Sequence, residues 1–270
     1  MSANHPFNKY FSMPDHEYHA LPYVSQTKLK KLAQLEPAQW AEDCKIPFNG
    51  SDATRLGSVM HLVNLNEVSL SDIKTFKKLD GRTKEGKEQA KELEGTSIFL
   101  WEHEVDQAFM MAANFKSSHN VKGIMDNSVM IEQAGVCEIY NERNKDVKIY
   151  MKFKPDIVGV DFIADYKTIG DYCTDDNLRS AIKRSDYAFQ AASYLILDGM
   201  ISRSTKVNYY MIFQETVKPY GCRVVILDQN LIQKAYDRFD NAIKKYTKMS
   251  NGMILDPNYK DVTELTLPYY

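Results

Sequence analysis

The sequence has few cysteines, and their spacing excludes two classes of small, cross-linked domain. The four cysteines lie 36 or more residues apart and include no CxxC pair, so neither a zinc knuckle nor a dense disulfide framework is expected. No apolar run approaches the roughly 18 residues that a membrane-spanning helix needs, and the first 20 residues lack the basic and apolar pattern of a signal peptide. These absences predict a soluble protein of the reducing cytoplasm, with its cysteines buried as small apolar side chains.

A charge excess of either sign is also missing. Lysine and arginine number 34 against 36 aspartates and glutamates, which gives a net charge of −2 and excludes a uniformly basic nucleic-acid coat. The sequence is still compatible with a local basic groove, because electrostatic steering depends on where charges lie rather than on their sum. The chain has no Gly-rich phosphate loop, no G-x-S-x-G motif and no paired cysteine and histidine nucleophile, which disfavours a small-molecule enzyme of those classes.

Linkers, repeats and low-complexity tracts are absent as well. The 12 glycines and 9 prolines are scattered, so residues 1–270 are expected to form a single domain, with irregular segments at 1–24 and 250–270. Hydrophobic spacing predicts helices at 25–35, 52–65, in the polar part of 66–95, at 97–127, at 175–200 with a break near 185–186, and at 228–249. It predicts three or four consecutive antiparallel strands over 135–168, then strands at 206–215 and 221–227. This order indicates an α/β or α+β fold with one mixed sheet.

The segment K-P-D-I-V-G-V-D-F-I-A-D-Y-K-T, residues 154–168, places charged residues within strands that are otherwise apolar. Asp165 and Lys167 share a face, because side chains alternate along a strand, and the carbonyl of Tyr166 lies on the edge between them. If the hairpin turns around 159–162, Asp156 lies directly opposite Asp165, with Cβ atoms about 4.5–5.5 Å apart. Two carboxylates so placed repel each other, and one becomes hard to ionise.

A divalent cation between the two carboxylates removes this conflict. Mg²⁺ fits, because it takes oxygen ligands and keeps several waters for substrate and nucleophile, and Mn²⁺ is the alternative. Lys167 beside such a cation is placed to orient a water, to lower its pKa or to neutralise charge on a phosphorane-like centre. The pattern predicts phosphodiester hydrolysis. The alternative is a hairpin with surface acids and one cross-strand salt bridge, which the apolar flanks I-V-G-V and F-I-A disfavour.

The P-D and D-Y-K elements resemble the signature of the PD-(D/E)xK nuclease superfamily, with D-x-K in place of the commoner E-x-K. Within it the chain is similar to the exonuclease VIII (RecE) type of 5′→3′ double-strand DNA exonuclease, and more distantly to RecB nuclease domains and phage lambda exonuclease. Four further stretches carry the likeness in order: Y-H-A-L-P-Y-V-S-Q-T-K-L-K-K-L-A-Q-L-E-P-A-Q-W (18–40), R-L-G-S-V-M-H-L-V-N-L-N-E (55–67), D-G-R-T-K-E-G-K-E (80–88) and A-F-Q-A-A-S-Y-L-I (188–196). The resemblance implies a restriction-endonuclease-like core, with a central mixed β-sheet flanked by helices.

The resemblance also implies a role for each matching residue. The metal ligands are Asp156, Asp165, His61 on the Gly-x-x-x-His helix and the carbonyl of Tyr166, and the residue that handles the nucleophile is Lys167. Gln190 and Tyr194 lie at i and i+4 and so share one helical face, which in the family borders the active site and contacts the DNA end or supports the lysine. Thr168 follows the lysine as in many members and is expected to support the site.

One acidic position departs from the family pattern. The family often has a glutamate on the strand before the Pro-Asp strand, where this chain offers Glu138 one or two positions out of register, and Glu132 is the alternative. The basic residues expected nearest to DNA phosphates are Arg55, Arg82, Lys84 and Lys152. A solvated charged face is the alternative for every basic cluster.

The function that the resemblance implies is a Mg²⁺-dependent exonuclease that acts 5′→3′ on linear double-stranded DNA ends and leaves 3′ overhangs for recombination in a bacterial or phage-infected cell. The implied partners are DNA ends, a single-strand annealing protein and further copies of the chain in a ring. An endonuclease or a single-strand exonuclease would use the same chemistry. A non-catalytic module that binds DNA ends or proteins is the alternative of another class, disfavoured because both acids and the lysine are present.

Overall fold

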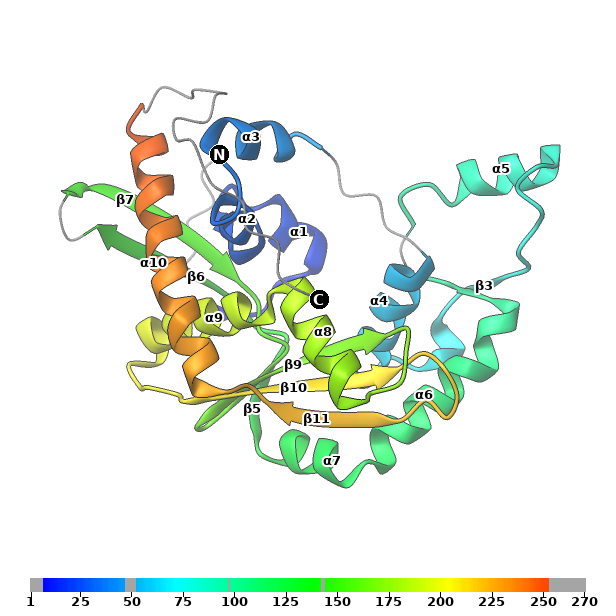
Figure 1. Ribbon diagram of the computed structural model, residues 1–270. Helices are drawn as coiled ribbons and strands as arrows, with labels where there is room; N and C mark the ends of the chain where they lie inside the picture. Colours follow the sequence, from blue (N-terminus) through cyan, green and yellow to red (C-terminus); the bar gives the residue numbers. More distant parts are fainter. Residues whose placement is uncertain (1–6, 47–51, 97, 142–143, 253–270) are drawn as a thin grey trace, which may run out of the picture.

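Two mixed β-sheets organise the protein in a computed structural model that describes residues 7–46, 52–96, 98–141 and 144–252 (Figure 1). In this part of the chain, one sheet contains β1 (Lys9–Phe11), β6 (Ala134–Asn141), β7 (Asn144–Phe153) and β2 (Val24–Ser25), in that order. The other contains β11 (Cys222–Ile226), β10 (Asn208–Glu215), β9 (Phe162–Ile169), β8 (Ile157–Gly159) and β5 (Ser128–Ile131). Within these two sheets the β2–β7 and β9–β10 pairs are parallel, and the other pairs are antiparallel.

The stretch 135–168 forms four strands, as predicted, but divides them between the two sheets. β6 and β7 form a hairpin in the first sheet, and β8 and β9 form a hairpin in the second. The chain changes sheet at residues 154–156, where Pro155 has no N–H with which to continue a ladder. The five-stranded sheet is the central mixed sheet that the sequence predicts. The four-stranded sheet is an addition that the strand pattern does not reveal.

Helix boundaries largely follow the predicted ones. The helices are α1 (Asp15–Ala20), α2 (Gln26–Leu32), α3 (Pro37–Asp43), α4 (Asp52–Leu65), α5 (Lys84–Glu92), α6 (Val105–Ser117), α7 (His119–Asp126), α8 (Asp175–Ser185), α9 (Tyr187–Ser202) and α10 (Gln229–Ser250). Ser25 caps α2 by accepting the N–H of Lys28, and Asp228 caps α10 in the same way. The break between α8 and α9 falls at Asp186, whose φ of +50° ends the first helix in the left-handed region. No described helix is both long and apolar enough to cross a bilayer.

Three segments differ from the prediction. The region 1–24, expected to be irregular, contains α1 and two short strands, and α3 follows the predicted end of the first helix. The region 97–127, expected to be helical, begins with β4 (Leu100–Trp101), which pairs with β3 (Thr75–Phe76), and a 3₁₀ turn precedes α6. Residues 253–270 and 1–6 lie outside the described part of the chain. The four cysteines are free, but Cys137 alone is buried and the other three are half-buried.

The five-stranded sheet has an apolar core on each face, and β9 contributes to both. Ile163 packs in the core with α2, α8, α9 and α10, whereas Phe162, Ala164 and Tyr166 pack in the core with α4, α6 and α7. Figure 1 shows α8 and α9 above β10 and β11, and α7 below them. This alternation decides which side chains of β9 face α9 and which face α4 and α6.

Candidate active site

The predicted pair on β9 lies on one face of the strand. Lys167 Nζ lies 2.5 Å from Asp165 Oδ2 and donates a hydrogen bond of 3.2 Å to the carbonyl of Tyr166. Asp165 is only 1% exposed. The ring of Tyr166 points to the other face, where it packs edge-on against Phe115. The expectation that the acid and the lysine share a face is therefore confirmed.

The position of Asp156 follows from the hairpin register. Ile157 pairs with Ala164, so the next position, 156, lies opposite 165 as the sequence predicts. β8 begins only at Ile157, and the Oδ2 atom of Asp156 accepts the N–H of Tyr166 at 2.8 Å in place of a strand carbonyl. This bond holds the two carboxylates together at the open end of the hairpin.

His61 and Glu132 complete the acidic group from two other elements. His61, on α4, lies 3.1 Å from Asp156 through Nε2 and 3.3 Å from Glu132 through Nδ1. One ligand atom from each of these three residues lies within 4.8 Å of the other two. Glu132 directly follows β5 with a left-handed backbone (φ +54°), which is uncommon for glutamate, and its N–H donates to the carbonyl of Asp156.

The glycine of the Gly-x-x-x-His helix has a steric role. A Cβ atom on Gly57 would lie 2.9 Å from Oγ1 of Thr168, so only glycine lets α4 approach β9 this closely. His61 follows one turn later on the same helix face and reaches Asp156. Thr168 thus lies close against α4, and its role in supporting the site stays a prediction.

Burial and charge together shift the acid–base properties of this group. Burial lowers the pKa of His61, but Asp156 and then Glu132 raise it more, to about 9. Burial and the neighbouring Asp156 raise the pKa of Asp165, whereas His61 and Lys167 outweigh burial and lower that of Asp156. Burial also raises the pKa of Glu132. Of these three carboxylates, Asp165 and Glu132 therefore resist ionisation, whereas Asp156 ionises readily.

The donor chemistry fits a hard divalent cation. The carboxylate oxygens of Asp156 and Glu132 and one imidazole nitrogen of His61 converge here, and Mg²⁺ and Mn²⁺ take such ligands. Asp165 and the carbonyl of Tyr166, which the sequence also predicts as ligands, both contact Lys167 on β9. Burial, and next the repulsion from Asp156, raises the pKa of Asp165, and a bound cation would oppose both effects. The residues present are therefore suited to hold the metal that the sequence predicts.

Gln190 supports the site from α9. Its amide Nε2 donates to Oδ1 of Asp165 at 2.5 Å, and both side chains are buried. Tyr194, one turn later, is buried against the ring of Phe153 and is 7% exposed. Gln190 therefore acts on Asp165 rather than on Lys167, and Tyr194 packs in the core instead of contacting DNA.

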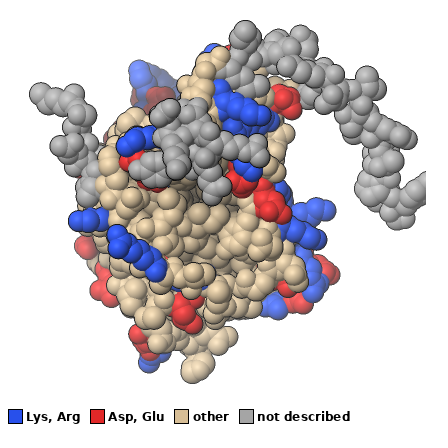
Figure 2. All heavy atoms as spheres, turned by 90° about the vertical axis from the view of Figure 1, so that its left-hand side faces the viewer, with Lys and Arg blue, Asp and Glu red and all other residues tan. Residues whose placement is uncertain are grey.

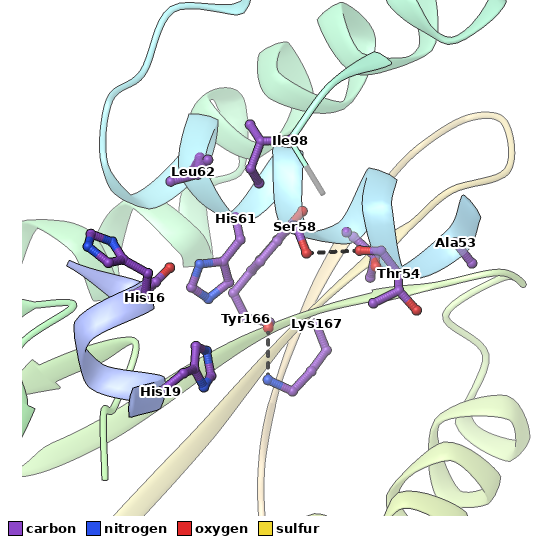
Figure 3. A pocket seen from close by; sticks show the side chains of 13 residues that line it. His16, His19, Ala53, Thr54, Ser58, His61, Leu62, Ile98, Tyr166 and Lys167 are labelled. Atoms are coloured by element: carbon purple, nitrogen blue, oxygen red, sulfur yellow. Dashed lines mark hydrogen bonds between the residues drawn. The ribbon is translucent and has the colours of Figure 1, made fainter. Parts of the chain in front are cut away.

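An open cleft of about 760 Å³ gives access to the group (Figure 3). His61, Tyr166, Lys167 and Thr168 line its floor, α4 contributes Thr54 and Ser58, and α1 contributes Asp15, His16 and His19. Figure 3 shows the ring of His61 and the amine of Lys167 directed into the same space. A phosphodiester can therefore reach Lys167 and His61 from solvent, whereas Asp156 and Asp165 are buried and are not among the residues that line the cleft.

Two further sequence predictions are wrong. Arg55 is 6% exposed, with its guanidinium 2.6 Å from Glu104 and bonded to the carbonyl of Phe99, so it anchors α4 and cannot reach a phosphate. Glu138 lies on β6 in the other sheet, 3.0 Å from Lys148. The extra acid beside His61 is Glu132, the alternative position, because β5 rather than β6 pairs with β8.

The other basic residues lie elsewhere. Arg82 and Lys84 are exposed at the start of α5, at the edge of the molecule in Figure 1 and away from β9, and Arg82 pairs with Asp80. Their contact with DNA stays a prediction. Lys152 is buried and donates to three backbone carbonyls, so it is not a phosphate contact. On the face shown in Figure 2, basic and acidic side chains mix around the rim and leave the centre uncharged.

The sequence reasoning did not find Lys154. Its amine lies 2.5 Å from Glu132 and 2.5 Å from Asp15, at the point where the chain changes sheet. Burial lowers the pKa of Lys154, but these two carboxylates outweigh it and raise the value. No local pattern marks this lysine, because its partners lie more than 20 residues away in the chain.

Comparison with known proteins supports the fold but does not identify the reaction. No protein-family model and no curated protein sequence matches the chain. The chain is similar to the crystal structure of a presumed exonuclease from Eubacterium rectale, with a TM-score of 0.62 and 12% identity over 96% of this chain and 97% of that one. A phage-related exonuclease from Haemophilus somnus matches with a TM-score of 0.34 and 15% identity over 87% and 98%. The protein therefore has a mixed α/β fold with a restriction-endonuclease-like core, in which a central mixed sheet is flanked by helices.

Proposed function

We propose that this protein is a Mg²⁺-dependent exodeoxyribonuclease that degrades linear double-stranded DNA from its ends, 5′→3′, and leaves 3′ single-stranded overhangs. The observation that carries the proposal is that Asp156 contacts His61 and Asp165 contacts Lys167, while His61 and Lys167 both line an open cleft. The ordered motifs that resemble RecE-type exonucleases, and the exonuclease description of the Eubacterium rectale structure, support the choice of substrate.

The side chains divide the work of phosphodiester hydrolysis. Asp156, Asp165, His61 and the Tyr166 carbonyl would hold the cation, with Glu132 as a further acid. Bound there, the cation would supply Lewis-acid stabilisation of charge on the phosphate and lower the pKa of a water. Nearby carboxylates outweigh burial and raise the pKa of Lys167, so its ammonium stays charged and is placed to orient the water and neutralise the phosphate.

The reaction balances without a redox partner. The oxygen of one water bonds to phosphorus while the bond to the 3′ oxygen breaks, and the proton lost by the water is matched by the one that the 3′ oxygen gains. The products carry a 5′ phosphate and a 3′ hydroxyl. The 5′→3′ polarity, the annealing partner and a ring of subunits depend on the sequence resemblance alone and complete the proposal.

Digestion of end-labelled linear duplex DNA in Mg²⁺ tests this function. The wild type is compared with Asp165→Ala and Lys167→Ala, and Asp161→Ala is the matched control, because Asp161 lies exposed in the turn of the same hairpin. Activity should fall by about a hundredfold or more in both site variants, as for loss of a group that stabilises a transition state, and should persist in the control. Substrates blocked at the 5′ or the 3′ end reveal the polarity.

Two results would refute the proposal. A wild type that digests nothing in Mg²⁺ or Mn²⁺, or digestion that survives both site substitutions, would favour a binding module on the same fold. Cleavage of covalently closed circles would instead identify an endonuclease with the same chemistry.

A further inference from the structure

Helix α1 forms one wall of the cleft although it is too short to be stable alone. It has six residues, well below the roughly 12–15 at which isolated helices become even marginally stable in water. Two lysines at the end of β7 hold its ends. Lys154 pairs with Asp15 at the first turn, and Lys152 donates 2.9 Å hydrogen bonds to the carbonyls of Tyr18, His19 and Leu21 at the last.

These lysines are themselves unusual. Lys152 is 6% exposed, and the side chain of Lys154 is 13% exposed, whereas lysine is seldom buried to this extent. Lys154 also contacts Glu132 of the acidic group. Through this shared amine, α1 has a fixed position relative to the proposed metal ligands.

The side chain that α1 presents to the cleft is His19. It is exposed, and Figure 3 shows its ring directed toward the space between His61 and Lys167, while the ring of His16 is turned away. Within the described residues, neither ring nitrogen of His19 has a hydrogen-bond partner, and its neighbour is the ring of Tyr18 at 5.3 Å. Lys152 bonds only to the backbone carbonyl of His19, so the imidazole stays available to a ligand.

We propose that His19 contacts the substrate strand, with a ring N–H donating to a non-bridging phosphate oxygen next to the phosphodiester held at Lys167. The proposal rests on the proposed nuclease function and deepens it. Imidazole keeps at least one N–H in either protonation state, and such contacts position a strand without reading its sequence. Lys154 neutralises Asp15 on the same helix, and Thr54 and Ser58 add hydroxyls on the opposite wall.

Steady-state digestion of 5′-labelled linear duplex at saturating Mg²⁺ tests the role of His19. His19→Ala should lower kcat/KM by about ten- to a hundredfold, the effect of one hydrogen bond to a charged group, chiefly by raising KM. His19→Gln retains an amide N–H and should recover part of the loss. His119→Ala removes an exposed histidine from α7 and should stay within about twofold of the wild type, the usual effect of a surface change. The half-saturating Mg²⁺ concentration and the Tm should not change in any variant.

The outcomes separate this inference from the proposed function. An active wild type with His19→Ala of equal kcat/KM refutes the contact and leaves the nuclease proposal standing. A change in half-saturating Mg²⁺ without a change in KM also refutes it, because His19 would then act on the metal. A wild type without activity overturns both proposals.

Discussion

Replacing Gln190 with leucine should weaken metal binding by one to two orders of magnitude and leave the fold intact. The amide donates to Oδ1 of Asp165 at 2.5 Å in a buried setting, and a hydrogen bond to a charged group is worth about 1.5–3 kcal/mol. Since about 1.4 kcal/mol is a factor of ten, its loss predicts a ten- to hundredfold change. The same range is typical when a residue that supports a metal ligand is removed.

The effect should depend on pH in a defined direction. The hydrogen bond stabilises the ionised form of Asp165, so its loss should raise further a pKa that burial and Asp156 already raise. Metal ligands must be deprotonated to bind. The half-saturating Mg²⁺ concentration should therefore fall as pH rises through the pKa of Asp165, and in Gln190→Leu this fall should occur at higher pH.

Ser193→Ala is the control, because Ser193 is buried one turn away and donates only to the carbonyl of Gln190. Both variants should lose stability, measured as Tm without metal. Mg²⁺ dependence of nuclease activity and direct titration with Mn²⁺ report the affinity. Equal metal affinity in Gln190→Leu, Ser193→Ala and wild type would refute the reasoning and reduce Gln190 to a packing residue.

Three further predictions concern groups outside the catalytic pair. Arg55→Leu leaves Glu104 as an uncompensated buried charge and should cost about 3–5 kcal/mol in urea unfolding; a loss below about 1 kcal/mol would contradict the buried pair. Burial lowers the pKa of Lys152 from 10.5 to about 8, so the folded state loses this proton first, and stability contributed by Lys152 should rise between pH 8 and 10.5. The Tm of Lys152→Met should not show that rise, and equal pH profiles of Tm in this variant and the wild type would contradict the prediction. Glu132→Gln should raise the half-saturating Mg²⁺ concentration about tenfold, while Glu138→Gln leaves it unchanged. The reverse pattern would show that Glu138, and not Glu132, is the extra acid of the site.

Short-range patterns in the sequence determined most of the local structure. Apolar spacing and capping side chains act within a few residues, so the extents of α4 and α10 and the break at Asp186 could be predicted. The hairpin arithmetic that places Asp156 opposite Asp165 also depends only on spacing around a turn. The resemblance of ordered motifs then predicted His61 and Gln190 as residues of the site, and in the structure His61 contacts Asp156 and Gln190 contacts Asp165.

Tertiary packing decided which of several plausible residues lie at that site. Glu132 and Glu138 look alike as candidates, and the choice depends on β5 rather than β6 pairing with β8. From the sequence Arg55 is predicted to be a surface cation, but in the structure it is buried against Glu104, 49 residues later in the chain.

The position of α1 was set in the same way, by Lys152 and Lys154, more than 130 residues from it in the chain. The sequence by itself therefore determined most of the secondary structure and the hairpin that carries the proposed chemistry. Only the tertiary structure decided the second acid, the buried arginine and the wall of the cleft, because these depend on contacts between segments that no local pattern links.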